Sequence, residues 1–173
     1  IALHLLLLTF VRQGELRGAL WSEFDLERAV WTVPAERMKM RTPHIVPLSR
    51  QAVALLTRLK AITGGRAHLF PNHRNPKACM GKTTLNAALV RMGFGNELTP
   101  HGFRATASTM LNELGHPSDV IERQLAHEQR NRVRASYNHA EYMPERRKMM
   151  QQWADILANL AKGAQVVPMK RRA

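Results

Sequence analysis

The spacing of apolar residues changes from helical to strand-like once along the chain, and this change constrains the fold most. Residues Val30–Val33 favour β-structure, and Pro34 ends the run. We expect two further strands at residues 37–41 and 44–48, with a turn between them at Thr42 and Pro43. Helical patterns occupy most of the remaining chain. The sequence therefore predicts a mostly α fold with a small antiparallel β-sheet near the N-terminus.

Capping residues mark several predicted helices. Ser49 is suited to cap one helix, and Thr99 followed by Pro100 begins another, which ends at Gly115. The predicted helices cover residues 1–9, 15–21, 51–61, 83–92, 100–114, 117–126 and 144–160. The last is amphipathic, and its apolar stripe indicates core packing more than a partner surface. That stripe consists of Met149, Met150, Trp153, Ile156, Leu157 and Leu160.

The charge of the chain points to a polyanionic partner. Lys and Arg number 26 against 13 Asp and Glu among 173 residues, which gives a formal net charge of +13. Self-repulsion of this size favours nucleic acid as the partner, and an anionic membrane surface second. The chain lacks the basic, aromatic-rich amphipathic helix expected of a membrane-surface protein. Its one cysteine, Cys79, excludes an intramolecular disulfide and a Cys-rich zinc site, as suits a reducing compartment.

Both ends of the chain carry distinctive compositions. Residues 1–11 are strongly apolar, but a membrane-spanning helix needs about 20 such residues. The run also lacks the flanks of a signal peptide. Since no methionine stands first and a helix begins at once, we expect a fragment whose N-terminal part is missing. Residues 164–173 form a basic tail, which we expect to be disordered.

Two short basic motifs are ambiguous when taken singly. Arg12 and Glu15 lie three apart at a helix start, so the glutamate can orient the guanidinium group. Alone, such a pair is more simply interpreted as a surface ion pair. Arg37, Lys39 and Arg41 would share one face of the predicted strand at 37–41. That face suits a phosphate backbone, but it equally suits a solvated edge strand.

Two further motifs carry groups suited to phosphoryl chemistry. His101 and Arg104 lie in the first turn of a predicted helix, where free N–H groups favour an anion. Arginine binds two phosphate oxygens, and histidine transfers protons near neutral pH. His127 is followed ten positions later by Tyr137, and the other tyrosine is Tyr142. A phenol ionises near pH ~10, so a tyrosine nucleophile needs cationic or basic neighbours. Both tyrosines could instead be packing residues, which is our default for Tyr142, and the nearby arginines at 130, 132 and 134 could simply contact DNA backbone.

In this order, the motifs resemble the catalytic domain of tyrosine recombinases, especially the phage and genomic-island integrase branch. The resemblance extends from about Leu5 to Tyr142. It implies that Arg12 and Arg104 clamp the phosphate, with Glu15 supporting Arg12. It also implies the roles of four further residues: Lys39 protonates the leaving 5′-oxygen, His101 binds phosphate and transfers a proton, His127 is the second histidine, and Tyr137 is the nucleophile.

The resemblance also implies a function and an organisation. Residues 1–163 would be an integrase catalytic domain, lacking the N-terminal core-binding domain of the family. The activity would be site-specific recombination that integrates or excises a mobile element through a 3′-phosphotyrosine intermediate. The partner would be double-stranded DNA bearing attachment sites. The protein would be a monomer in isolation and a homotetramer on this DNA. The location would be the cytoplasm and nucleoid of a bacterial host. The scheme needs no metal or cofactor, and we expect none at His68 and His73.

Several departures keep alternatives open. The family often has glycine at the position of Phe10, and Leu-Gly-His where this chain has Leu-Ala-His with Ala126. The stretch from His127 to Tyr137 is one residue longer than in many members, which leaves Tyr142 as a rival nucleophile. A type IB topoisomerase would share the tyrosine chemistry. A degenerate, non-catalytic DNA-binding accessory module would also be basic, although the intact set of site residues argues against it.

Overall fold

The computed structural model describes residues 1–39, 41–127 and 141–163 of the chain. The elements follow in this order: α1 (Ala2–Thr9), α2 (Gln13–Arg17), the 3₁₀ helix η1 (Trp21–Glu23), β1 (Phe24–Asp25), β2 (Val30–Val33), the 3₁₀ helix η2 (Ala35–Arg37), β3 (His44–Pro47), α3 (Arg50–Thr63), α4 (Thr84–Arg91), α5 (Gly102–Glu113), α6 (Ser118–Leu125) and α8 (Met143–Leu160). The predicted fold class, mostly helical with a small antiparallel sheet, is confirmed.

The sheet has three antiparallel strands in the order β1-β2-β3. Trp31 of β2 lies opposite Val46 of β3 and is fully buried. Its ring stacks on Phe24 at 5.0 Å, and its Nε1 donates a hydrogen bond to Glu23. This stacking stabilises β1, a two-residue strand that the sequence did not predict.

The predicted strand at residues 37–41 is wrong. Residues 35–37 form η2, and a turn follows. Arg37 turns inward, where its guanidinium group donates to the carboxylate of Glu23 and to the backbone carbonyl of Glu15. Met38 is also buried. Adjacent inward side chains are incompatible with the alternation of a strand, so Arg37 does not share a basic face with Lys39.

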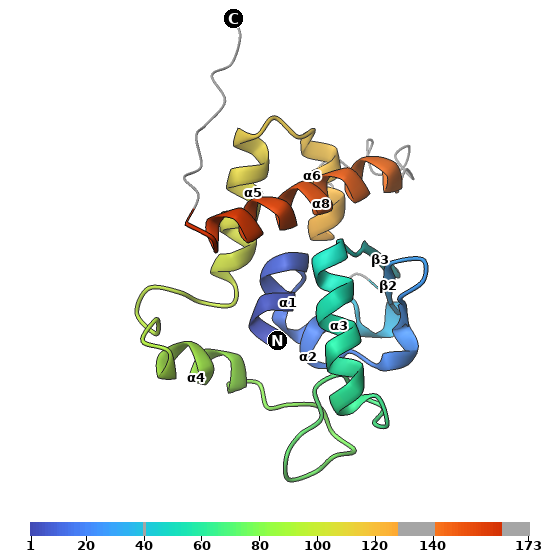
Figure 1. The fold of residues 1–173 in the computed structure, drawn as a ribbon. Helices are drawn as coiled ribbons and strands as arrows, with labels where there is room; N and C mark the ends of the chain where they lie inside the picture. Colours follow the sequence, from blue (N-terminus) through green and yellow to red (C-terminus); the bar gives the residue numbers. More distant parts are fainter. Residues whose placement is uncertain (40, 128–140, 164–173) are drawn as a thin grey trace, which may run out of the picture.

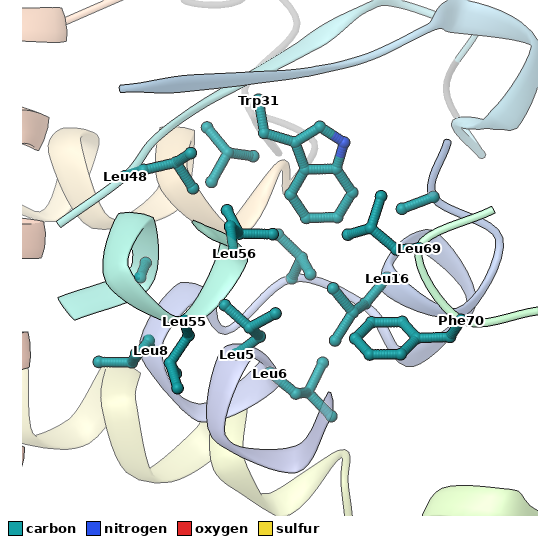
Figure 2. Packing of buried hydrophobic residues seen from close by; sticks show 14 of the residues in the cluster. Leu5, Leu6, Leu8, Leu16, Trp31, Leu48, Leu55, Leu56, Leu69 and Phe70 are labelled. Atoms are coloured by element: carbon teal, nitrogen blue, oxygen red, sulfur yellow. The ribbon is translucent and has the colours of Figure 1, made fainter. Parts of the chain in front are cut away.

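Two hydrophobic clusters meet on α1. The first joins α1 and α2 to the sheet and α3, with Leu5, Leu6, Leu16, Trp31 and Leu56 among its members (Figure 2). The second joins the end of α1 to α5, α6 and α8. Figure 1 shows α1 beside α3 and below the layer formed by α5, α6 and α8, and α1 contacts α3, α5 and α8. A helix that packs against both clusters must be apolar on nearly all sides, which accounts for the apolar N-terminal run.

Helix α8 joins the second cluster through the predicted apolar stripe. Met149, Met150 and Trp153 are buried, which confirms core packing for this part of the stripe. The Trp153 ring contacts Phe10 edge-on at 6.3 Å, and its Nε1 donates to the carbonyl of Leu7. Leu160 is exposed at the end of the helix. The final helix is therefore anchored on α1, the same helix that leads into the arginine motif.

The predicted Ser49 cap is confirmed, whereas the N-cap residue of α5 is His101 and not Thr99, and some helix boundaries differ. The Ser49 hydroxyl accepts the N–H of Ala52 at the start of α3. The Thr99 hydroxyl accepts the N–H of Gly102, but α5 begins at Gly102 because residues 100 and 101 form the preceding turn. Helix α2 ends at Arg17, earlier than predicted.

Within residues 1–39, 41–127 and 141–163, no helix combines the length and the apolarity needed to cross a bilayer.

Candidate active site

Residues far apart in sequence line one pocket of about 400 Å³. They are Arg12, Gln13, His101, Arg104 and His127. Arg12 and Gln13 lie at the start of α2, His101 and Arg104 at the start of α5, and His127 just beyond α6. The pocket therefore gathers two guanidinium groups and two imidazoles. Glu15 orients one of the guanidinium groups, and Glu122 orients one of the imidazoles.

Arg12 is held both at its backbone N–H and at its guanidinium group. It is the N-cap residue of α2, and Glu15 closes a capping box by accepting the Arg12 backbone N–H at 2.9 Å. The other carboxylate oxygen of Glu15 accepts from Arg12 Nη1 at 2.9 Å, and Arg12 Nη2 donates to the carbonyl of Ala126 at 3.0 Å. Glu15 is only 5% exposed, so this is not the solvated surface pair that the spacing alone would suggest.

Arg104 is buried, with 5% of its surface exposed. Its Nη1 donates to the carbonyl of Phe10 at 2.5 Å, and its Nη2 donates to the carbonyl of Leu125 at 2.8 Å. Burial, and next the positive charge of Arg12, lower the pKa of Arg104 to about 10. Arg104 thus remains a cation at neutral pH, and it is held there by main-chain oxygens.

Both guanidinium groups are anchored on helix C-termini that end in left-handed residues. Phe10 caps α1 with φ 39°, and Ala126 caps α6 with φ 49°. The free carbonyls at a helix C-terminus carry partial negative charge, which suits a cation. A left-handed conformation costs a non-glycine residue about 1–2 kcal/mol. These are the two positions at which the resemblance leads one to expect glycine, so the chain keeps the backbone geometry without it.

His127 lies between Arg104 and an acidic residue. Its Nδ1 contacts a Glu122 carboxylate oxygen at 2.8 Å, and its Nε2 lies 3.4 Å from Arg104 Nη2. Because a carboxylate only accepts, Nδ1 carries the proton, and Nε2 is directed toward the pocket. His101 is exposed at the N-cap of α5 and lines the same pocket. The two imidazoles can therefore reach a group bound by the arginines.

Of the remaining predicted site residues, the structure describes Lys39 and does not describe Tyr137. Lys39 is exposed in the turn that follows η2, and it is not one of the pocket-lining residues. Tyr137 lies outside the described residues, as do the arginines at 130, 132 and 134. Tyr142 is half-buried before α8 and packs against the second hydrophobic cluster. This packing agrees with our default interpretation of Tyr142.

Gln13 is a pocket residue that the sequence analysis missed. Its side-chain amide donates to the carbonyl of Lys82 at 2.7 Å, which links α2 to the loop before α4. Its only signal in the sequence is its place directly after Arg12. Among the described residues, no group of three or more His, Cys, Asp or Glu side chains could hold a metal ion.

The arrangement of the elements is that of a tyrosine recombinase catalytic domain. The integrase of the Tn1549 transposon, solved as residues 82–397 in complex with circular intermediate DNA, superposes with a TM-score of 0.60 at 19% identity. The superposition covers 86% of this chain and 56% of that one. At this identity the likeness establishes the fold.

The sequence comparisons establish the family. The phage integrase family matches residues 1–143. The chain is 47% identical over 161 residues to prophage integrase IntA of Escherichia coli K12, and 49% identical over 173 residues to the integrase of enterobacteria phage P4. These alignments cover 93% and 91% of the chain, but 39% of each relative. The chain belongs to the phage integrase family, and it spans about two fifths of the length of these relatives.

Proposed function

We propose that residues 1–163 are the catalytic domain of a site-specific DNA recombinase that integrates or excises a mobile element. The observation that carries this proposal is the convergence of Arg12, His101, Arg104 and His127 on one pocket. Membership of the phage integrase family supports the reaction class. The net charge of +13 supports double-stranded DNA as the substrate.

In the proposed reaction, the phenolic oxygen of Tyr137 attacks a DNA phosphodiester. A phosphotyrosine bond forms at the 3′ side, and the bond from phosphorus to the 5′-oxygen breaks. Negative charge develops on the non-bridging oxygens, which Arg12 and Arg104 would bind. Their preorganised donors can act without rearrangement, since buried or ion-paired contacts already hold both groups. Glu15 orients Arg12 throughout.

Proton transfer completes the cleavage step. The departing 5′-oxygen is a poor leaving group as an alkoxide, and Lys39 would donate a proton to it. His101 and His127 would bind phosphate oxygens and transfer the phenolic proton. The free 5′-hydroxyl of another strand then attacks the phosphotyrosine, which restores Tyr137 and exchanges the strands. We propose that four copies of the protein assemble on paired DNA sites for this exchange.

Covalent trapping tests the proposal. The full natural polypeptide is incubated with a nicked duplex that carries its attachment site, in EDTA, and covalent protein–DNA product is measured on denaturing gels. We expect an adduct that Tyr137→Phe abolishes and Tyr142→Phe preserves. The reverse pattern would reassign the nucleophile to Tyr142. No adduct from the unaltered protein would refute the enzyme and favour the non-catalytic DNA-binding module.

A second experiment separates the roles of Arg104 and Lys39. Arg104→Ala should abolish the adduct, because loss of one preorganised donor costs about 3–4 kcal/mol of barrier. Lys39→Ala should slow cleavage of ordinary DNA but recover on a 5′-bridging phosphorothiolate, whose sulfur leaves without a proton. A Lys39→Ala defect that is equal on both substrates would exclude Lys39 as the general acid. Affinity for DNA should fall with salt, with a slope of about −0.9 per phosphate contact.

A further inference from the structure

Arg146, in the first turns of α8, is fully buried and uses all of its hydrogen-bond donors. Nε and Nη2 donate to the side-chain oxygen of Gln124 at 3.1 and 2.8 Å, and Nη2 also donates to the carbonyl of Ile45. Nη1 donates to the backbone carbonyl and to a carboxylate oxygen of Glu141, both at 3.3 Å. Since a guanidinium group has five N–H donors, every donor has a partner.

The partners of Arg146 lie on both sides of the segment 128–140 in the sequence. Gln124 is in α6, shortly before this segment, and Glu141 follows it directly. Glu141 also pairs with Arg123 of α6. One buried cation therefore ties the chain before residue 128 to the chain after residue 140. Tyr137 is part of the sequence that these two ends enclose.

The same contacts reach the backbone that holds the pocket arginines. The Gln124 amide donates to the carbonyl of Thr9 at 3.3 Å, next to Phe10, whose carbonyl binds Arg104. Gln124 also directly precedes Leu125, whose carbonyl binds Arg104 as well. The cluster of Arg146, Gln124 and Glu141 thus contacts or contains the backbone positions next to the two that hold Arg104.

We propose that Arg146 is a positioning residue that sets the two ends of the Tyr137-bearing segment relative to Arg104. The inference rests on the proposed function, in which Tyr137 is the nucleophile. A shift of either end would break hydrogen bonds to a buried charge, which is costly. Burial lowers the pKa of Arg146 to about 10, so the group remains charged at neutral pH. Arg146 does not line the pocket and acts only through these contacts.

The test compares single-turnover adduct formation on the nicked duplex, at saturating DNA, for Arg146→Met and Arg146→Lys in the full natural polypeptide. Leu59→Ala is the matched control, because Leu59 is a buried residue of α3 in the first hydrophobic cluster, outside the Arg146 contacts. Misplacement of a reacting group by about 1 Å can cost 10²-fold in rate. We expect Arg146→Met to slow adduct formation by about that factor, with DNA affinity nearly unchanged. Leu59→Ala should lower the melting temperature but leave the rate near wild type while it is folded.

Two further readouts distinguish positioning from general damage. The 5′-bridging phosphorothiolate should not rescue Arg146→Met, although it rescues Lys39→Ala, because a better leaving group does not move the nucleophile. Arg146→Lys retains the positive charge but lacks the planar guanidinium group, so this variant should fold and still form adduct slowly. If Arg146→Met does not fold, the rate of Arg146→Lys tests the positioning role. A folded Arg146 variant that cleaves as fast as Leu59→Ala would overturn the inference. Failure of the unaltered protein to form any adduct would instead overturn the proposed function.

Discussion

Replacing Glu15 by glutamine tests whether the capping box holds the first arginine in place. One carboxylate oxygen of Glu15 accepts the backbone N–H of Arg12, and the other accepts Nη1, each at 2.9 Å. Glutamine offers one oxygen and one NH₂ group. If the oxygen keeps the cap, the NH₂ group faces the guanidinium donor. The substitution therefore removes one charge-assisted hydrogen bond and leaves two donors opposed.

The structure sets the size of the expected loss. A hydrogen bond to a charged group contributes about 1.5–3 kcal/mol, and this pair is shielded because Glu15 is 5% exposed. For a domain of this size, 1 kcal/mol shifts the melting temperature by about 2–4 °C. Glu15→Gln should therefore lower the melting temperature by about 3–12 °C. Adduct formation should fall as well, since the Ala126 carbonyl alone would then hold the Arg12 side chain.

Asp25→Asn is the matched control for this change. Asp25 also accepts the backbone N–H of an arginine three residues away, Arg28, and pairs with its side chain at 3.6 Å. The two side chains are 48% and 84% exposed, so this pair contributes at most about 1 kcal/mol. Calorimetry and the trapping assay are run on both variants. If Glu15→Gln melts no lower than Asp25→Asn and forms adduct at the wild-type rate, Arg12 does not depend on Glu15.

Three further predictions concern folding stability. Burial, followed by the charge of Arg146, lowers the pKa of His44 from 6.5 to about 3. The free energy of unfolding should therefore be highest above about pH 6.5 and fall as the pH is lowered from there toward 3, by about 2 kcal/mol at pH 5. His44→Gln should flatten this pH dependence in urea titrations, and an unchanged pH dependence would exclude His44 as its source. Trp153→Ala should cost about 3–5 kcal/mol in the same titrations, and a cost below about 1 kcal/mol would show that α8 is not anchored on α1. Ala126→Gly should leave the free energy of unfolding nearly unchanged, because relief of left-handed strain offsets the added entropy of the unfolded chain. Ala107→Gly inside α5 should lower the free energy of unfolding by about 1 kcal/mol. Equal losses for the two variants would contradict the strain at Ala126.

The sequence predicts best those elements that local interactions determine. Ser49 bonds the N–H of Ala52 three residues away, and Val30–Val33 consists of strong β-formers, so a short window contains the information needed. The strand predicted at 37–41 failed for the opposite reason. The inward turn of Arg37 depends on Glu23 and on the carbonyl of Glu15, which are 14 and 22 positions away. Nothing in a window of alternating basic residues and methionines reveals those partners.

In the candidate site, too, the sequence predicts the local contacts but not those between distant segments. The pairing of Arg12 with Glu15 follows from their spacing, whereas its burial does not. The contacts of Arg104 with the carbonyls of Phe10 and Leu125 join chain segments 94 and 21 positions away. Every residue has a backbone carbonyl, so no sequence motif marks the ones that bind Arg104. The catalytic role of Tyr137 stays a prediction, since Tyr137 lies outside the described residues.

The anchoring of both pocket cations on peptide oxygens has a consequence for how such a site tolerates mutation. Side-chain replacement at Phe10 or Ala126 cannot delete a carbonyl, and at these two places the chain keeps the turn without glycine. A change in helix length is different, because one inserted or deleted residue in α1 or α6 would rotate the acceptors by about 100° around the helix axis. Among relatives, the number of residues between the site motifs should therefore vary less than the identity of those residues.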